Sequence, residues 1–206
     1  MEKIVYVTGN YGKYINVKNH FEEKGIDIDY FTCDIEELDI NDIELISKDK
    51  AKKAYEKLGK PCFVGDSGFY IEGYPGNPDY PGAFVKRSGI STDIENLLKI
   101  MNDVENRNCR FIDCLTFYDG IAFFSFLGVS RGTLSTTVRG NDKVEAKSNL
   151  WRVFIPNNCT KTLAEMTEEE FKDRNDDRTS ATEQFIEWYK REYLINNKQK
   201  IKAVKH

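Results

Sequence analysis

A short segment near the N-terminus carries residues that are suited to binding an anion. The sequence V-T-G-N-Y-G-K, residues 7–13, follows the apolar run 4–7, which is typical of a buried strand. If a helix follows this turn, its unpaired N–H groups and positive dipole end face the turn, and Lys13 adds a charge in the first helical turn. Together with Thr8, these residues predict a phosphate-binding turn. A tight strand-to-helix turn with a solvated lysine would have the same sequence.

Carboxylates follow two other predicted strands and could hold a metal ion. Asp66 comes directly after the apolar run 62–64, and D-I-E-E-L-D, residues 34–39, follows the second predicted strand. Ligands bind at the carboxyl ends of strands in α/β sheets, so Asp66 and Asn10 could line one cleft. Two carboxylates at neighbouring strand ends can bind Mg²⁺ against phosphate oxygens and activate a water molecule. The alternative for residues 34–39 is a solvated acidic turn.

A lysine lies on the apolar face of the helix predicted over residues 42–58. Lys50 is four residues from both Ile46 and Ala54, which belong to the buried face of that helix. A lysine on an inward face is unfavourable unless an anion compensates its charge, and a phosphate is one such anion. The alternative is that the side chain of Lys50 extends from the edge of the face into solvent.

Composition excludes several other classes of function. The net charge of −4 does not suit a protein that coats nucleic acid, and no run of about 18 apolar residues could span a membrane. The N-terminus shows no signal-peptide pattern, and five cysteines without C-x-x-C spacing are typical of free thiols in the cytoplasm. His20 and His206 are the only histidines, so G-D-S-G at 65–68 has no well-placed base for serine-protease chemistry.

The periodicity of apolar residues predicts an α/β protein. A strand at 4–7, a helix at 12–24 that stops at Gly25 and a strand at 26–30 form a βαβ unit. The helix 42–58 and a short strand over 62–64 follow. Similar signals predict a helix capped by Thr92, a β-meander over 109–137 with a turn at Asp119–Gly120, and a strand over 151–156. The last part of the chain is predicted to form a short helix with a capping box of Thr167 and Glu170, a C-terminal helix over 185–193 and a frayed basic tail over 196–206.

Five motifs occur in a specific order over almost the whole chain. They are T-G-N-Y-G-K at 8–13, the pair Lys50–Ala51, D-S-G-F at 66–69, P-G-A-F at 81–84 with the basic Lys86 or Arg87 nearby, and T-L-A-E-M at 162–166. Each motif alone is weak, but their combination resembles the Ham1 family, the inosine triphosphate pyrophosphatases that remove non-canonical purine nucleotides.

The resemblance implies a fold and a reaction. The fold would be a curved, mixed central sheet with flanking helices, arranged as two lobes around a cleft. It would form a single domain over residues 1–195, usually as a homodimer. Enzymes of this family use Mg²⁺ to cleave a nucleoside triphosphate between the α and β phosphates, giving a monophosphate and pyrophosphate.

The resemblance also assigns roles to individual residues. The residues expected to contact the substrate are Thr8, Asn10, Lys13, Lys50, Ser67, Lys86, Trp151, Asp177 and Arg178. Glu37, or its neighbour Glu36, would bind the metal ion. Asp66 would bind the metal or act as the base toward the attacking water, with Lys50 beside it as a catalytic residue.

The sequence departs from the family pattern at three places. Gly65 stands where many members have an acid. Residues 147–156 lack the family's G-[FW]-G-[YW]-D-P loop, so that Trp151 could stack on a base or belong to the core. Asp177 stands in place of a histidine before Arg178, and a carboxylate there would favour hydrogen-bond donors such as those of guanine.

These departures leave three functions open. The protein could be a pyrophosphatase with altered nucleotide choice, or a house-cleaning enzyme for inosine and xanthosine triphosphates that uses other residues to read the base. It could also be a nucleotide-binding protein without turnover. Gly65 favours this last function, whereas the retained Asn10, Lys13, Lys50 and Asp66 disfavour it.

Overall fold

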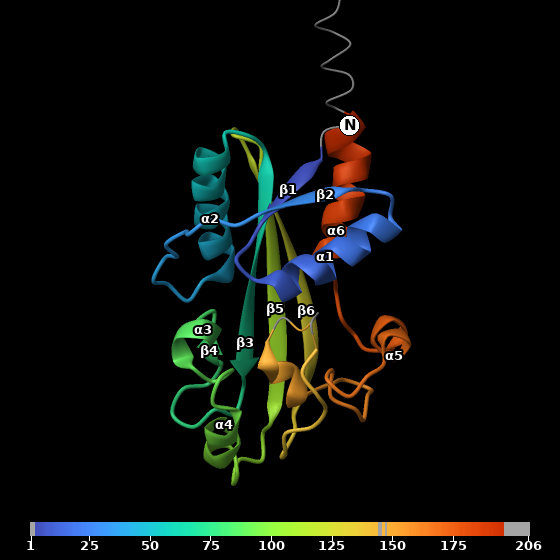
Figure 1. Cartoon of the computed structure of the whole chain (residues 1–206). Helices are drawn as coiled ribbons and strands as arrows, with labels where there is room; N and C mark the ends of the chain where they lie inside the picture. Colours follow the sequence, from blue (N-terminus) through green and yellow to red (C-terminus); the bar gives the residue numbers. More distant parts are fainter. Residues whose placement is uncertain (1–2, 144–145, 147, 196–206) are drawn as a thin grey trace, which may run out of the picture.

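The computed structural model describes residues 3–143, 146 and 148–195, and it has a mixed α/β fold. Seven strands form an open, mostly antiparallel sheet with the order β2-β1-β3-β5-β6-β7, and β4 pairs with β3 off this path. Helices flank the sheet (Figure 1). The prediction of a mixed central sheet with flanking helices is therefore confirmed. Lys147 and the predicted tail over 196–206 lie outside the described residues.

The N-terminal βαβ unit forms as the apolar pattern predicts. Strand β1 (Ile4–Val7) is buried along its length and pairs in parallel with β2 (Ile28–Phe31). Helix α1 (Tyr11–Glu23) connects them and buries Val17 and Phe21 against the sheet. The chain leaves the helix through Gly25, whose φ of +71° suits a residue without a side chain.

Helix α2 (Ile43–Leu58) begins after Asp42, whose carboxylate accepts hydrogen bonds from two backbone N–H groups of the first turn. The strand that follows is longer than predicted. Strand β3 (Cys62–Ile71) continues through residues 65–68, because β5 (Asn108–Tyr118) pairs with it from end to end. The prediction that Asp66 lies beyond the end of a short strand was therefore wrong.

The next elements build the other half of the molecule. They are β4 (Tyr80–Gly82), α3 (Val85–Ser88) and α4 (Ile94–Ile100). The predicted cap of α4 was one residue off, because the side chain of Asp93 accepts the hydrogen bond from Asn96 N while Thr92 Oγ1 donates to Gly89 O. The predicted turn at Asp119–Gly120 joins β5 to β6 (Phe123–Leu134) as an antiparallel pair.

The predicted strand over 151–156 was wrong in its first half. Residues 149–152 form a 3₁₀ turn, η1 (Asn149–Arg152), which the hydroxyl of Ser148 caps, and only β7 (Phe154–Pro156) is a strand. Helix α5 (Glu168–Asp173) begins with the predicted capping box. Helix α6 (Ala181–Trp188) continues into a π-helical turn, η2 (Tyr189–Tyr193).

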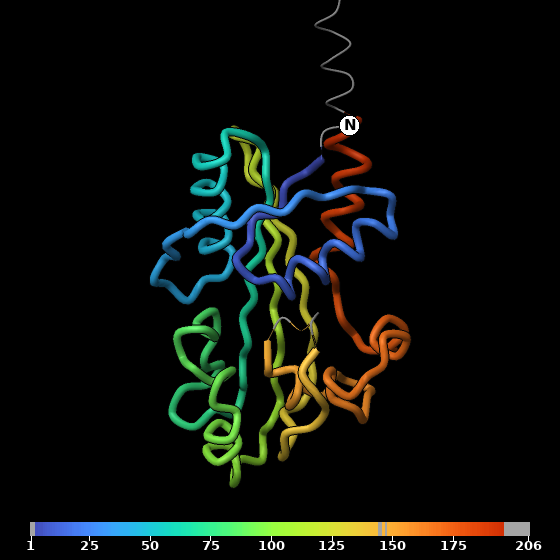
Figure 2. The backbone as a smooth tube through the Cα atoms, viewed as in Figure 1, coloured from blue at the N-terminus to red at the C-terminus, as the bar shows by residue number. Residues whose placement is uncertain are grey.

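The long strands β3, β5 and β6 run through two lobes that are visible in Figures 1 and 2. In the upper lobe, α1 and α6 cover one face of the sheet around Phe63 and Phe117, and α2 covers the other face around Cys62 and Val64. The lower lobe has its own apolar core, which includes Phe69, Leu134, Trp151 and Phe154. Among the described residues, no helix combines the length and apolar character that a membrane crossing requires.

Candidate functional site

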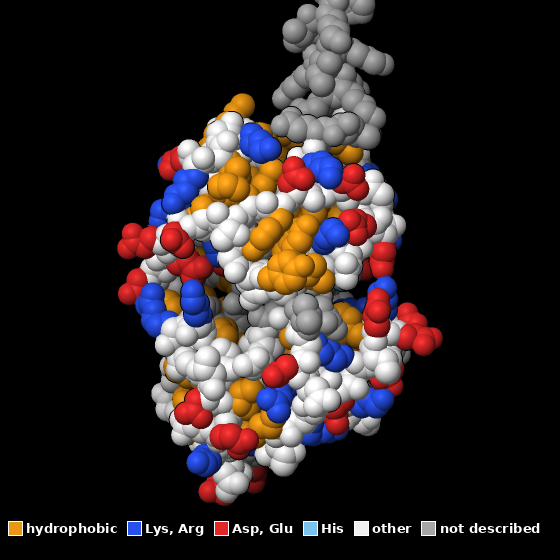
Figure 3. Space-filling view, in the orientation of Figure 1, with side chains coloured by type: hydrophobic (Ala, Val, Ile, Leu, Met, Phe, Trp, Pro, Cys, Tyr) orange, Lys and Arg blue, Asp and Glu red, His pale blue; other side chains and the backbone are white. Residues whose placement is uncertain are grey.

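One edge of β3 is left open between the two lobes. On this side β1 pairs with β3 only as far as Val64, and β4 resumes the pairing at Phe69. Within the described chain, residues 65–68 therefore have no strand neighbour on that edge, and side chains on both faces of β3 border the opening. A cleft of about 1030 Å³ lies here, and Figure 3 shows the surface hollowed between the lobes.

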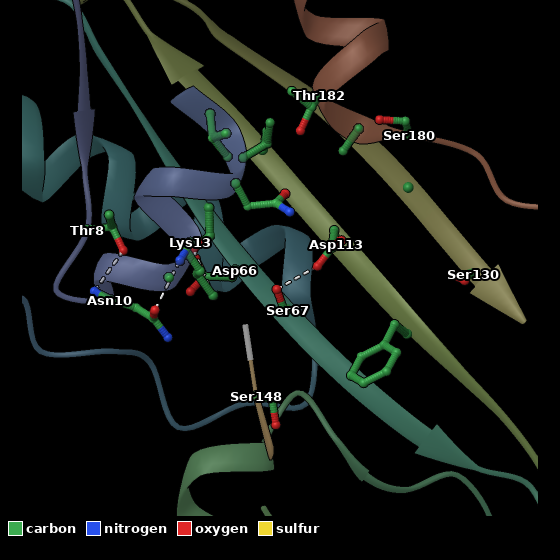
Figure 4. A pocket seen from close by; sticks show the side chains of 18 of the residues that line it. Thr8, Asn10, Lys13, Asp66, Ser67, Asp113, Ser130, Ser148, Ser180 and Thr182 are labelled. Carbon is green, nitrogen blue, oxygen red and sulfur yellow. Dashed lines mark hydrogen bonds between the residues drawn. The ribbon is translucent and has the colours of Figure 1, made fainter. Parts of the chain in front are cut away.

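The N-terminus of α1 points into this opening, as the sequence predicts. Asn10 caps the helix, since its Oδ1 accepts a hydrogen bond from Lys13 N at 3.0 Å, and Thr8 Oγ1 accepts from Asn10 N at 3.2 Å. Lys13 Nζ donates to Gly65 O at 3.3 Å, on the open edge of β3. Figure 4 shows Thr8, Asn10 and Lys13 close to Asp66. Phosphate binding by this turn remains a prediction, but the structure places its residues in the cleft.

Lys50 lies between two carboxylates on the α2 side of the opening. Its Nζ is 2.8 Å from Glu37 Oε1 and 2.8 Å from Asp66 Oδ1. The side chains of Lys50 and Asp66 are 15% and 11% exposed, so this lysine does not extend into solvent. Burial alone would lower the pKa of Lys50, but the charges and hydrogen bonds of Asp66 and Glu37 outweigh it and raise that pKa. The anionic partners of Lys50 in this structure are therefore protein carboxylates.

The same carboxylates suit a divalent cation. Asp66 Oδ2 is buried and accepts no hydrogen bond from the described residues, so this carboxylate oxygen can still bind a cation or accept a hydrogen bond. Of the two candidate glutamates, Glu37 lines the cleft, whereas Glu36 accepts a hydrogen bond from Lys53 through its backbone oxygen. In the described part of the chain, no three His, Cys, Asp or Glu residues cluster as a complete metal cage. Mg²⁺ commonly binds to one or two carboxylates plus phosphate and water, which fits this donor set.

The position of the missing acid is filled by another side chain. Successive residues of β3 face opposite sides of the sheet, so a side chain at Gly65 would point away from Asp66. A Cβ at Gly65 would lie 2.7 Å from Tyr6 Oη and 2.8 Å from Leu115 Cδ2. Tyr6 is 1% exposed and its ring stacks on Phe63, with 4.6 Å between the ring centroids. The Tyr6 hydroxyl therefore occupies the volume that an acid at position 65 would need.

The hydroxyl of Tyr6 stays protonated. Burial raises the pKa of Tyr6 well above its ordinary value, and the nearby charges of Asp66 and Asp113 raise it further. Tyr6 also lines the cleft. Where many family members have an acid, this protein therefore has Gly65 and, beside it, the uncharged hydroxyl of Tyr6.

The contact between Tyr6 and Gly65 predicts a specific dependence of stability on both residues. Gly65→Ala is expected to lower the free energy of unfolding by about 1–3 kcal/mol, because the added methyl group has no space beside the Tyr6 hydroxyl. In a Tyr6→Phe background the loss should be smaller, since the hydroxyl is gone. Urea denaturation of the four proteins measures the difference, and equal losses in both backgrounds would contradict this packing.

The floor of the cleft on the other face of β3 carries an acid that the sequence did not single out. Ser67 Oγ donates to Asp113 Oδ1 at 2.6 Å, and these residues are directly opposite each other on β3 and β5. Asp113 is half-buried and lines the cleft. The available signal was a carboxylate between two apolar residues of a predicted strand, Ile112 and Cys114.

The segment before α6 brings arginines to the wall of the cleft. Asp176, whose side chain is 1% exposed, accepts hydrogen bonds from Arg174 Nε at 2.9 Å and from Arg178 Nη1. Arg174 and Arg178 line the cleft, and Arg174 lies over the ring of Phe171 with its Cζ 4.2 Å from the centroid. The structure therefore places Arg178 at the site, held by an aspartate that the sequence did not single out.

The resemblance to the Ham1 family predicts that Asp177 lies beside the base, but in the structure its side chain lies outside the cleft lining. Exposure alternates along residues 174–180, so Asp176 and Arg178 turn inward while Asp177 faces solvent. Asp177 is not among the residues that border the cleft, and its carboxylate accepts long hydrogen bonds of 3.4 and 3.5 Å from Asn157 Nδ2. Base recognition by Asp177 therefore remains a prediction, and the structure places its carboxylate outside the cleft lining.

A pair of substitutions distinguishes these two aspartates. Asp176→Asn is expected to lower the free energy of unfolding by about 1–3 kcal/mol, because it weakens two charge-assisted hydrogen bonds of a buried carboxylate. It should also raise the KM for nucleotides, since Arg178 loses its support. Asp177→Asn is the matched control and is expected to leave both stability and the ranking of purine nucleotides unchanged. A change of ranking with Asp177→Asn would restore the original expectation.

The remaining predicted substrate residues differ in their surroundings. Trp151 is 4% exposed and stacks on Phe171, with 5.1 Å between the ring centroids, so it belongs to the lower core although it also borders the cleft. Lys86 is exposed on α3 and lines the cleft from the lower lobe. Of the residues assigned from the sequence, all but Asp177 and the alternative metal ligand Glu36 line one opening.

The fold and the site together define an α/β protein of two lobes whose cleft carries lysines, a helix N-terminus and paired carboxylates. This chain belongs to the Ham1 family, whose family model matches residues 4–188. It is 33% identical over 189 residues to a dITP/XTP pyrophosphatase of Methanopyrus kandleri, covering 91% of this chain and 96% of the relative. A dITP/XTP pyrophosphatase of Pyrococcus horikoshii is 32% identical over 189 residues, covering 91% and 97%.

Solved structures agree with the fold. A HAM1 protein from Coxiella burnetii superposes with a TM-score of 0.72 at 21% identity, covering 90% of this chain and 97% of that one. The Ham1 protein of Staphylococcus aureus gives a TM-score of 0.66 at 19% identity, covering 84% and 90%. The resemblance seen in the motifs is thereby confirmed at the level of family and fold.

Proposed function

We propose that this protein hydrolyses a purine nucleoside triphosphate between the α and β phosphates, releasing a monophosphate and pyrophosphate. The observation that carries the proposal is the meeting of the α1 N-terminus with the cluster of Lys50, Glu37 and Asp66 at the open edge of β3. The names of the relatives, which are dITP/XTP pyrophosphatases, support the same reaction. The proposal includes a role in removing non-canonical nucleotides. It also includes that the protein acts in the cytoplasm and as a homodimer.

The polyphosphate would lie across the opening. The N–H groups at the start of α1 and the ammonium group of Lys13 face one side of it, and Lys86 faces it from the lower lobe. These groups compensate the charge of the phosphates, which is the main requirement for phosphoryl transfer. Mg²⁺ bound by Glu37 and Asp66 would supply further charge compensation to the phosphate oxygens.

Asp66 is the group best placed to accept a proton from the attacking water. Its Oδ1 is held by Lys50, while the buried Oδ2 accepts no hydrogen bond from the described residues. As the water oxygen bonds to phosphorus, its proton moves to the carboxylate and the bond to the bridging oxygen breaks. Lys50 fixes the orientation of the carboxylate, because its Nζ lies 2.8 Å from Asp66 Oδ1.

The base would lie at the far end of the cleft, where the family pattern is changed. Arg174 and Arg178 line the cleft, and several of their N–H groups already donate to Asp176 and to backbone oxygens. Their other N–H groups would match the O6 and N7 acceptors of a 6-keto purine. We infer that these arginines, rather than Asp177, read the base, so that the choice among purines differs from that of relatives with the usual loop and histidine.

Incubation with Mg²⁺ and a panel of canonical and deaminated nucleoside triphosphates tests the proposal. Pyrophosphate release, with one equivalent of monophosphate and no orthophosphate, is the expected result, and chelation of the metal should stop it. Release of orthophosphate alone would contradict cleavage at the α–β bond. Calorimetric binding without any release would indicate a nucleotide-binding protein.

A further inference from the structure

The ring of Tyr6 on β1 has a clear role in packing, but packing does not account for its hydroxyl group. The residue is 1% exposed and its ring stacks on Phe63, which in turn stacks on Phe21 of α1 with 5.4 Å between the ring centroids. A phenylalanine ring could form the same stack. Tyr6 also lines the cleft. Since burying a hydroxyl is unfavourable unless it forms hydrogen bonds, its neighbours bear on what it does.

The Tyr6 hydroxyl lies beside two parts of the proposed phosphate site. The first is the turn from β1 into α1, because the side chain of Thr8 hydrogen-bonds to this hydroxyl and also accepts from Asn10 N at 3.2 Å (Figure 4). The second is the open edge of β3. Tyr6 Oη lies 2.7 Å from the position that a Cβ on Gly65 would have, and the carbonyl oxygen of Gly65 accepts from Lys13 Nζ. The hydroxyl therefore adjoins both the turn and the edge.

This hydroxyl can donate its proton to a ligand. A hydroxyl group has one proton to donate and two lone pairs that can accept. Because Thr8 Oγ1 already accepts from Asn10 N, its own proton is available to the oxygen of Tyr6, and the proton of Tyr6 is left for a further acceptor. Among the described residues, Thr8 is the only one that hydrogen-bonds to this hydroxyl. A ligand oxygen at the open edge would complete a chain of hydrogen bonds in which each bond strengthens the next.

The surroundings of the hydroxyl favour a phosphate oxygen as this acceptor. Asp66 and Asp113 are close enough for their charges to act on Tyr6, so a phosphate group bound here would be repelled by carboxylates. Phosphate binding therefore requires donors at the same place, and a phosphate oxygen is a strong, charged acceptor. An acid at position 65 would add a further negative charge, whereas the hydroxyl of Tyr6 supplies a donor without one.

We propose that the Tyr6 hydroxyl donates a hydrogen bond to a phosphate oxygen of the bound nucleotide, so that Tyr6 binds substrate as well as forming part of the core. The inference rests on the proposed function, because it takes the position of the phosphates from it. It also gives a reason for Gly65, since a side chain at that position would occupy the space of the hydroxyl beside the open edge.

Tyr6→Phe tests the proposal, because it removes the hydroxyl and keeps the ring that stacks on Phe63. The kcat/KM for pyrophosphate release from inosine triphosphate is expected to fall by about 10- to 100-fold, the range for a hydrogen bond to a charged group. Tyr30→Phe is the matched control. Tyr30 is the register partner of Tyr6 on β2, but it is 37% exposed and is not among the residues that line the cleft, so this variant should keep the wild-type value.

Binding of inorganic triphosphate separates a failure of this inference from a failure of the proposed function. Calorimetry after chelation of the metal requires no turnover, because the proposed reaction needs Mg²⁺. The Kd is expected to rise by about 10-fold or more in Tyr6→Phe and to stay unchanged in Tyr30→Phe. Circular dichroism should show that both variants are folded.

The outcomes are distinct. A Kd that Tyr6→Phe leaves unchanged would overturn the role of the hydroxyl, whether or not the wild-type protein cleaves nucleotides. A fall in kcat/KM with unchanged binding of triphosphate would also overturn it and would assign the hydroxyl to another part of the substrate. Weaker binding of triphosphate by Tyr6→Phe, in a protein that cleaves no nucleotide, would support the inference while the proposed reaction fails. Absence of triphosphate binding by the wild-type protein would overturn both.

Discussion

Asp66→Asn is expected to reduce the rate of pyrophosphate release by at least about 100-fold, the lower range of general-base contributions. The amide cannot accept the proton of the attacking water, and it is a weaker ligand for Mg²⁺ than a carboxylate. Folding should be retained, because the amide oxygen can still accept the hydrogen bond of Lys50 at 2.8 Å. The measurement is steady-state release of pyrophosphate under saturating Mg²⁺.

The control for this prediction is Asp27→Asn, whose side chain is exposed and is not among the residues that line the cleft. It should retain the wild-type rate, and circular dichroism should show that both variants are folded. A rate for Asp66→Asn within a few-fold of the wild type would remove Asp66 from the chemistry. Glu37 would then be the next carboxylate to test, because it contacts the same ammonium group.

Lys50→Met is expected to lower the free energy of unfolding by about 3–5 kcal/mol, the range found when one member of a buried ion pair is removed. Lys50 and Asp66 are 15% and 11% exposed on their side chains, so the remaining carboxylate would stay in the protein interior without its cation. Methionine keeps the length and apolar stem of lysine, so the loss reflects the charge. Urea denaturation with linear extrapolation gives the difference.

A second lysine of the same helix provides the control. Lys53 also forms an ion pair on α2, with Asp49 at 2.7 Å, but its side chain is 35% exposed. Lys53→Met should therefore change stability by only about 0–1 kcal/mol. The double variant Lys50→Met with Asp66→Asn should recover a large part of the loss, because it removes the uncompensated charge. Equal losses for the two lysine variants would show that the ion pair of Lys50 has no special role.

The sequence could predict those parts of the site whose geometry is local. The turn from β1 into α1 depends on an apolar strand, on Asn10 as the helix cap and on the first turn of the helix. All three lie within residues 4–14. Lys50 was identified because helical periodicity sets the face on which a residue lies. The capping box of Thr167 and Glu170 and the turn at Asp119–Gly120 are local for the same reason.

The order of motifs gave the family and hence the mixed sheet with its two lobes. This inference does not come from local physical signals, because β1 pairs with β3 and β3 pairs with β5, and the paired residues are about 40 to 60 positions apart in the chain. The motifs carried that information only because they resemble those of proteins with a known fold.

What the tertiary structure alone decided is which side chains face the opening. Strand β3 continues past Asp66 because β5 pairs along its whole length, and this register brings Asp113 opposite Ser67. The side chain of Tyr6 reaches across the sheet to the space above Gly65, a contact that no spacing in the sequence reveals. A shift of one residue along an extended segment reverses the direction of a side chain. For this reason the sequence could locate the segment around Arg178, whereas only the three-dimensional structure could show that Asp176, and not Asp177, holds it.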